Sequence, residues 1–159
     1  MKSIETRAII IGGGATGCGT LRDLTLRGIE CVLIEKSDVS SGTTGRNHGL
    51  LHSGARYAVN DLESARECIA ENRILKKIAR HCIEDTGGLF VTLPEDDPDY
   101  HGRLIEHCKY AGIKCEEMKV REALEMEPNL NPDILAALRV PDGTIDPFRL
   151  CSTNILDAT

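Results

Sequence analysis

Three glycines near the start of the chain have the spacing of a phosphate-binding turn. Gly12, Gly14 and Gly17 stand directly after a short apolar run. In such a turn the first glycine permits a tight bend, the second lets the backbone approach a pyrophosphate, and the third lets a helix pack closely against a strand. That helix would offer the phosphates free N–H groups, at Ala15 and Thr16, and a partial positive charge. The spacing predicts a dinucleotide site; the alternative is a glycine turn without a ligand.

An acidic residue stands where a dinucleotide site needs one. Glu35 ends the second predicted strand, and its neighbour Lys36 belongs to the same predicted site. A carboxylate at this point accepts hydrogen bonds from the hydroxyls of the adenosine ribose. It would repel a 2′-phosphate, which disfavours NADP. The glycine pattern does not decide between FAD and NAD.

A second loop, at residues 40–45, is rich in glycine and threonine. Thr43, Thr44 and Arg46 are able to donate further hydrogen bonds to the phosphates of a ligand. Such a loop suits a large dinucleotide that lies extended across the domain. The alternative interpretation is an ordinary surface turn followed by a helix.

The glycine turn lies between elements that would position it. Residues 7–11 predict a buried strand, and residues 18–27 predict a helix that ends at Gly28. Residues 30–34 predict a second buried strand. Strand, helix and strand in this order predict a βαβ unit, which is typical of α/β proteins.

The rest of the chain predicts a long helix followed by short strands and helices. The helix, at residues 61–82, has apolar side chains at three- and four-residue steps. Its predicted inward side chains are Leu62, Ala65, Cys68, Ile69, Leu75, Ile78, Ala79 and Cys82. Strands are predicted at 89–93, 113–118 and 135–140, and helices at 98–112, 120–126 and 148–158. Because a βαβ sheet needs further parallel strands, we expect the chain to be part of a longer protein.

Composition excludes other classes of protein. The 159 residues are 41% apolar, yet no apolar run approaches the roughly 20 residues of a membrane-spanning helix. Acidic and basic residues are interspersed, and the net charge of −6 argues against a nucleic-acid partner. The seven cysteines include no Cys-x-x-Cys pair, so we expect a reducing cytoplasm, no disulfide framework and no metal site. The first residues do not predict a signal peptide.

Three segments carry a resemblance to a known family. They are GGGATG at residues 12–17, TTGRNHGLLHSGARYAV at residues 43–59 and VPDGTIDPFRL at residues 140–150. From residue 5 to residue 159 the chain resembles the N-terminal part of the FAD-dependent glycerol-3-phosphate dehydrogenases, and most of all the A subunits of the bacterial anaerobic enzymes. Ser53 departs from the family, which often has glycine there.

The resemblance implies an α/β, Rossmann-like FAD-binding domain of the glutathione-reductase/DAO type, incomplete and with the start of a substrate domain. Within residues 1–159, the fingerprint would occupy about residues 7–35 and a flavin-proximal loop about 40–57. A partial substrate-side region would occupy about residues 86–140. The implied reaction oxidises sn-glycerol 3-phosphate to dihydroxyacetone phosphate, with electrons passing through FAD to quinone.

The resemblance also implies roles for three residues of the flavin-proximal loop. His52 would lie near the isoalloxazine, Arg56 would bind the substrate phosphate, and Tyr57 would line the same pocket. The general base would be His52 or a residue outside this chain. Other subunits of an anaerobic glycerol-3-phosphate dehydrogenase complex would be partners, and would hold a cytoplasmic protein peripherally at the inner face of the membrane. The alternatives are a truncated, catalytically inactive FAD- or ADP-binding fragment and another DAO-like flavin oxidoreductase.

Overall fold

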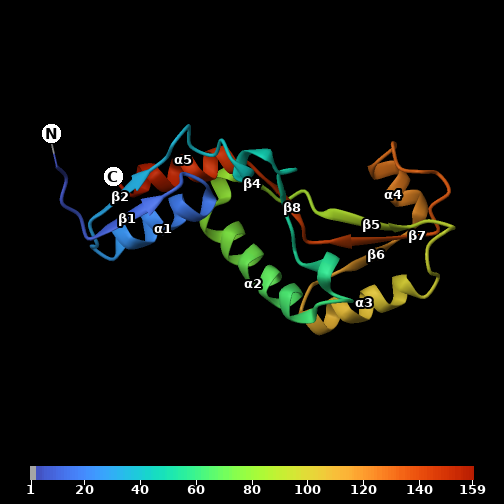
Figure 1. Ribbon diagram of the computed structural model, residues 1–159. Coiled ribbons are helices and arrows are strands. Elements are labelled where there is room, and N and C mark those ends of the chain that lie inside the picture. The colour runs from blue at the N-terminus through green and yellow to red at the C-terminus, as the bar shows by residue number, and fades with distance from the viewer. Residues whose placement is uncertain (1–2) are drawn as a thin grey trace. The chain divides into compact units, whose positions relative to one another are not determined.

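The computed structural model describes residues 3–159, which divide into two compact units (Figure 1). Unit 1 contains the described residues up to Gly49 together with Ile145–Thr159. Unit 2 contains Leu50–Thr144. Each unit builds a sheet and helices of its own.

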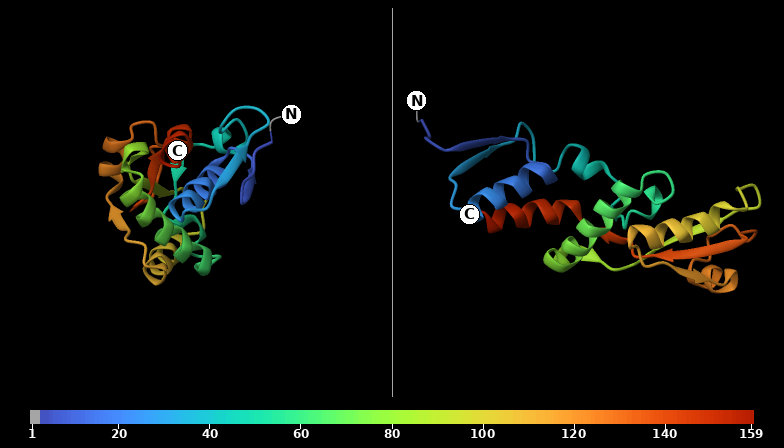
Figure 2. Two further views of the ribbon diagram at one scale, coloured as in Figure 1. Left: turned by 90° about the vertical axis from the view of Figure 1, so that its left-hand side faces the viewer. Right: turned by 90° about the horizontal axis from the view of Figure 1, so that it is seen from below.

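Unit 1 is built on a parallel βαβ unit. β1 (Ala8–Ile11) pairs in parallel with β2 (Cys31–Ile34), and α1 (Ala15–Leu26) connects the two strands. The last helix of the chain, α5 (Pro147–Asp157), packs along α1, and the two lie side by side in each view (Figure 1, Figure 2). The predicted α/β fold class and its strand–helix–strand unit are confirmed.

The glycine turn and a second glycine set the bounds of α1. The helix begins at Ala15 rather than at the predicted Cys18, because Gly14 already serves as its extended N-cap. It ends before Gly28, as predicted. Gly28 has a φ of +71°, a left-handed conformation that glycine adopts without the steric penalty of a Cβ.

The β1–β2 pair leaves one face open within unit 1. Ile10, which is opposite Leu33 in the register, faces α1, whereas Ile9 and Ile11 point away from it and Ile11 is 87% exposed. The prediction that both strands are buried is therefore wrong for the outward side chains. A parallel strand is buried on both faces only where both are covered, and within the described part of unit 1 the covering helix is α1 (Figure 2).

Unit 2 contains an antiparallel sheet of three strands. β7 (Ala136–Val140) lies at its centre, between β5 (Gly88–Thr92) and β6 (Glu116–Met118). The helices of the unit are α2 (Leu62–Ile78), α3 (Tyr100–Ala111) and α4 (Val120–Met126). Strands were predicted at these three segments, although their antiparallel pairing was not, and the bounds of α4 are those of the predicted helix.

The side chains of β7 alternate between two hydrophobic cores on opposite faces of this sheet. Leu138 and Val140 pack with buried residues of α2 and α3, among them Ile69 and Leu104. Ala137 packs instead with α4 and its flanking segments. The helices thus cover both faces of the sheet, with α3 on one side and α4 on the other (Figure 1).

Several short elements were not predicted. β3 (Leu50–Leu51), β8 (Gly143–Ile145) and β4 (Ile83–Glu84) form a second sheet in that order. Three 3-10 turns are η1 (Thr43–Arg46), η2 (Ala55–Tyr57) and η3 (Arg80–Cys82). Strands of two or three residues are too short to show the alternation by which a strand is recognised in a sequence.

The helix predicted at residues 61–82 is shorter in the structure. α2 starts after Asp61, whose Oδ1 accepts a hydrogen bond of 3.0 Å from the N–H of Ser64, and ends at Ile78. Because the chain then turns into η3, Ile78 is 60% exposed, which contradicts its predicted inward position. The predicted burial of Ala79 and Cys82 is confirmed.

Candidate functional site

The glycine turn of unit 1 requires glycine for its own geometry. Gly12 has a φ of +109°, and its N–H donates to the carbonyl oxygen of Ile34 at 2.8 Å. A Cβ at Gly17 would collide with the carbonyl oxygen of Gly12, and one at Gly14 would come within 3.0 Å of Thr44 Oγ1. The turn therefore brings the start of α1 close to the strand, as the spacing predicts.

The N-terminus of α1 is open to a ligand. Gly14 provides no side-chain cap, and the first turn contains no acidic residue. Ala15 and Thr16 are exposed, and the N–H of Ala15 donates to Thr44 Oγ1 at 3.0 Å. The partial positive charge of the helix end and these N–H groups form a cradle that fits the pyrophosphate of FAD.

Glu35 lies at the end of β2 and bonds to the glycine turn. Its Oε2 accepts a hydrogen bond of 2.6 Å from the N–H of Gly13, and its Oε1 accepts one of 2.9 Å from the N–H of Ser37. The bond from Gly13 is the largest influence that lowers the pKa of Glu35, and the backbone and charge of the exposed Lys36 lower it further. The carboxylate is therefore ionised and able to accept hydrogen bonds.

The loop after β2 reaches the same turn through a residue that sequence reasoning missed. Ser40 is buried, has a φ of +63°, and donates its N–H to the carbonyl oxygen of Gly13 at 2.9 Å. Among the described residues its Oγ has no hydrogen-bond partner. Nothing in the Ser-Ser-Gly string marks this conformation. Thr43 and Arg46, both predicted to bind the cofactor, are exposed on η1.

Unit 2 contains the other predicted site residues. Arg56 and Tyr57 are exposed on η2, which begins after Gly54. Gly54 has a φ of +91°, and a Cβ there would lie 2.5 Å from the carbonyl oxygen of Ala65 in α2. The close approach of the loop to α2 fixes the turn on which Arg56 and Tyr57 stand.

His52 is half buried in unit 2 and lies beside a carboxylate. Its Nδ1 is 3.3 Å from Oδ2 of Asp142. Sequence reasoning named residues 141–143 only within the segment 140–150 that carries the resemblance, and it left Asn72 out of the inward face of α2. It therefore missed both Asp142 and Asn72. Their signal in the sequence is weak, because a buried polar side chain follows no hydrophobic period.

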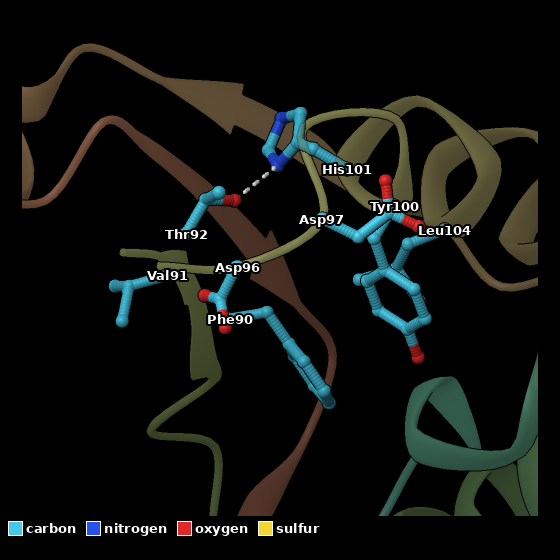
Figure 3. A pocket seen from close by; sticks show the side chains of 8 residues that line it. All are labelled: Phe90, Val91, Thr92, Asp96, Asp97, Tyr100, His101 and Leu104. Atoms are coloured by element: carbon cyan, nitrogen blue, oxygen red, sulfur yellow. Dashed lines mark hydrogen bonds between the residues drawn. The ribbon is translucent and has the colours of Figure 1, made fainter. Parts of the chain in front are cut away.

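A separate cavity of about 280 Å³ in unit 2 contains none of the predicted site residues (Figure 3). It is lined by Phe90, Val91, Thr92, Asp96, Asp97, Tyr100, His101 and Leu104. Its carboxylates and its histidine already have protein partners: Asp96 accepts a hydrogen bond from the N–H of Leu93, Asp97 accepts one from Arg103, and His101 Nδ1 lies 3.3 Å from Thr92 Oγ1. The cavity therefore ranks below the glycine turn as a functional site.

Two cysteine thiols are held in the unreactive form. Burial raises the pKa of Cys18 to about 11, and the nearby Cys151 of α5 adds to the shift. Burial also raises the pKa of Cys108 to about 12, again with a contribution from a second cysteine, Cys115. Since the thiolate is the nucleophile and the metal ligand, neither cysteine is suited to that chemistry.

Residues 3–159 lack two further features. No group of three His, Cys, Asp or Glu side chains in this part of the chain is arranged to hold a metal ion. In the same residues no helix has both the length and the apolar character to cross a membrane.

Comparison with known proteins relates the whole chain to one family. The family model DAO, FAD dependent oxidoreductase, matches residues 7–159. The A subunit of the anaerobic glycerol-3-phosphate dehydrogenase of Haemophilus influenzae is 60% identical over 159 residues, which cover 100% of this chain and 28% of that relative. The chain thus spans less than a third of the length of this relative.

Solved structures agree with the family. L-Proline dehydrogenase from P. horikoshii matches 99% of this chain and 42% of its own with a TM-score of 0.83 and 26% identity. L-α-Glycerophosphate oxidase from Mycoplasma pneumoniae, solved with FAD bound, has a TM-score of 0.77 at 22% identity, covers 98% of this chain and 43% of its own, and shows the shared fold. The predicted cofactor, FAD, is confirmed for the family, and the glycine turn fits it. The chain belongs to the DAO family of FAD-dependent oxidoreductases.

Proposed function

We propose that the chain is the N-terminal, FAD-binding portion of a glycerol-3-phosphate dehydrogenase, which oxidises sn-glycerol 3-phosphate to dihydroxyacetone phosphate. The observation that carries this proposal is the 60% identity, over the whole chain, to the A subunit of the H. influenzae enzyme. We assign about residues 7–35 to the dinucleotide-binding fingerprint and about residues 40–57 to the flavin-proximal loop. About residues 86–140 form part of the substrate-side region.

The glycine turn and its neighbours are the proposed cofactor site. Gly12, Gly14 and Gly17 shape the turn, and the N–H groups of Ala15 and Thr16 face the pyrophosphate. Glu35 accepts hydrogen bonds from the ribose. The remaining members of the site are Lys36, Thr43, Thr44 and Arg46. The open N-terminus of α1 supports this assignment, since it offers donors without a competing acidic side chain. When bound, FAD supplies a two-electron acceptor for the hydride of a substrate carbon.

The flavin-proximal loop is the proposed substrate site. Arg56 binds the phosphate, for which the fork of guanidinium donors is well matched, and its exposure on η2 leaves it accessible. His52 takes the proton of the C2 hydroxyl while the C2 hydrogen leaves as hydride, so the carbinol becomes a ketone with charge and electrons balanced. Tyr57 lines the same pocket.

The partners we propose are the other subunits of an anaerobic glycerol-3-phosphate dehydrogenase complex, through which electrons reach quinone. The H. influenzae relative is by name one subunit of such an enzyme, which supports an assembly of this kind. These subunits would hold the protein at the inner face of the cytoplasmic membrane.

Two alternatives compete with this function. One is a catalytically inactive fragment that binds FAD or ADP, which the short span of the chain against its relatives favours. The other is a different DAO-like flavin oxidoreductase, such as one that oxidises an amine, favoured by the fold likeness to L-proline dehydrogenase.

Absorbance and turnover together separate these alternatives. We call a protein that contains this sequence and has the full length of its relatives the family-length protein. We expect it to purify with the visible absorbance of flavin and to reduce a dye with glycerol 3-phosphate. L-Proline and glycine are the control substrates. The 159-residue chain alone should show little or no turnover. Reduction with an amine and not with glycerol 3-phosphate would replace the proposed substrate, and absence of flavin from the family-length protein would overturn the cofactor site.

A further inference from the structure

A buried carboxylate in unit 2 contacts the segment that carries His52. Asp142 is 7% exposed, and its two oxygens have different partners. Oδ1 accepts a hydrogen bond of 2.7 Å from the N–H of Ser53, and Oδ2 lies 3.3 Å from Nδ1 of His52. The carboxylate, which directly precedes β8, therefore contacts the histidine and the residue after it, both of which follow β3.

The position of this carboxylate is determined by several further contacts. Leu51 of β3 is opposite Gly143 of β8, so the strands bring residues 51–53 and 141–143 together. Asn72, which is 1% exposed on α2, donates from Nδ2 to the carbonyl oxygens of Leu51, His52 and Pro141 at 3.2–3.3 Å. Both segments are thereby tied to the same helix.

Lys76, one turn further along α2, also holds the segment that contains Asp142. Its Nζ donates to the carbonyl oxygen of Pro141 at 2.9 Å and to that of Asp142 at 3.1 Å. On the other side, a Cβ at Gly88 of β5 would come within 3.0 Å of the Cβ of Asp142. The side chain of Asp142 consequently has little freedom to turn away from His52.

A carboxylate accepts hydrogen bonds and donates none. Its position beside the imidazole therefore determines which ring nitrogen carries the proton. Facing Oδ2 of Asp142, Nδ1 of His52 must carry its proton, and in the neutral ring Nε2 is then the basic nitrogen. We propose that Asp142 is a positioning residue that fixes the tautomer and orientation of His52, with the proton on Nδ1 and the lone pair on Nε2. The functional meaning of this inference rests on the proposed role of His52 as the base for the C2 hydroxyl.

The substitution Asp142→Asn tests the proposal because the structure dictates how the amide must lie. The N–H of Ser53 requires an acceptor, so the amide oxygen faces Ser53 and the amide NH2 faces His52. Nδ1 must then accept, which moves the ring proton to Nε2. The variant has nearly the same shape as the wild type but is expected to invert the histidine tautomer.

Nitrogen NMR of histidine side chains measures the tautomer directly. In the 15N-histidine-labelled protein, we expect His52 to show a protonated Nδ1 and an unprotonated Nε2. Asp142→Asn should exchange the two signals. The substitution His52→Gln identifies the resonance among the five histidines. Asp133→Asn is the matched control, because Asp133 is an exposed carboxylate of unit 2 outside the segments that hold Asp142, and its substitution should leave the tautomer unchanged.

Kinetics of the family-length enzyme then separate this proposal from the proposed function. Loss of a correctly oriented base should lower kcat for glycerol 3-phosphate by at least about tenfold, while KM and flavin content stay within about twofold. An Nδ1 that is unprotonated in the wild type, or a tautomer that Asp142→Asn leaves unchanged, overturns the proposal. The wild-type spectrum decides even if the variant does not fold. An inverted tautomer with an unchanged kcat supports the positioning role of Asp142 and rejects His52 as the base.

Discussion

Glu35 Oε2 accepts a hydrogen bond of 2.6 Å from the N–H of Gly13, so the carboxylate at the end of β2 is bonded to the middle of the glycine turn after β1. Its second oxygen accepts from Ser37. One side chain thus stabilises both segments that flank the proposed cofactor site. Each carboxylate oxygen has two lone pairs, so the ribose of a bound cofactor can share the side chain with the turn.

The stability of the protein should depend on the ionisation of Glu35. The backbone hydrogen bonds lower its pKa from the ordinary 4.5. For a lowered carboxyl pKa, the stabilisation is fully present above the unfolded-state value and is lost as the pH falls through the folded-state value. We expect Glu35→Gln to destabilise the protein at neutral pH and to have progressively less effect in acid, measured by urea unfolding. Glu30→Gln, on an exposed side chain of the same unit, is the control. A difference between wild type and Glu35→Gln that is constant with pH would contradict the prediction.

Two glycines of α1 should respond to alanine in opposite directions. Gly17→Ala places a methyl group against the carbonyl oxygen of Gly12, which must displace the turn and reduce both flavin content and thermal stability. Gly19 has open space around the position of its Cβ, so Gly19→Ala should stabilise the protein by about 0.5–1 kcal/mol through the higher helix propensity of alanine. Thermal unfolding and flavin absorbance measure both effects. Equal behaviour of the two variants would show that the contact of Gly17 with Gly12 is unimportant.

The hydroxyl of Thr44 should act as an external cap of α1. Its Oγ1 accepts from the N–H of Ala15 at 3.0 Å, which satisfies one of the unpaired donors at the helix start. By comparison with other caps, we expect Thr44→Val to destabilise the protein by about 1 kcal/mol. Thr44→Ser should restore most of this stability, because it keeps the hydroxyl. If Thr44→Ser and Thr44→Val unfold at the same temperature, the hydroxyl contributes nothing.

Arg56 should affect the binding of substrate and not of cofactor. A charge-assisted hydrogen bond contributes about 1.5–3 kcal/mol, and each 1.4 kcal/mol is about tenfold in affinity. In the family-length enzyme, Arg56→Ala should therefore weaken glycerol 3-phosphate binding roughly ten- to a hundredfold at normal flavin content. Lysine at this position should restore binding only in part, since it lacks the guanidinium fork.

The control for Arg56 is Arg121→Ala, which removes an exposed arginine that pairs with Glu125 on α4. Steady-state kinetics and flavin occupancy are measured on the same samples. Loss of flavin in Arg56→Ala, without a separate effect on substrate, would assign the residue to the cofactor instead.

Elements with strong local signals were predictable from the sequence. The bounds of α4 match the predicted helix, and the end of α1 follows from Gly28, because a left-handed glycine stops a helix through its own backbone. The start of α5 was placed at Phe148, one position after its first residue, Pro147. Each of these features depends on residues that are close together in the chain.

Features that depend on distant residues were not predictable. β3 and β8 are defined by pairing with distant strands, β3 with β8 and β8 also with β4, and neither has a recognisable period of its own. The burial of Asn72 interrupts the apolar pattern of α2, because its partners are carbonyl groups contributed by two distant segments. His52 was identified as a candidate through the resemblance, whereas Asp142, its partner, became visible only when the fold brought the two together.

The N–H of Ile145 donates a hydrogen bond of 2.8 Å to the carbonyl oxygen of Gly49. The residue at which the chain leaves unit 1, Gly49, therefore lies beside the residue at which it returns, Ile145. All of Leu50–Thr144 is therefore inserted at a single point of unit 1, and the insertion could be replaced by a short linker without stretching the chain. Closure of so small a gap costs little entropy. The inserted part can therefore vary in length and sequence while the glycine turn keeps its own supporting contacts within unit 1.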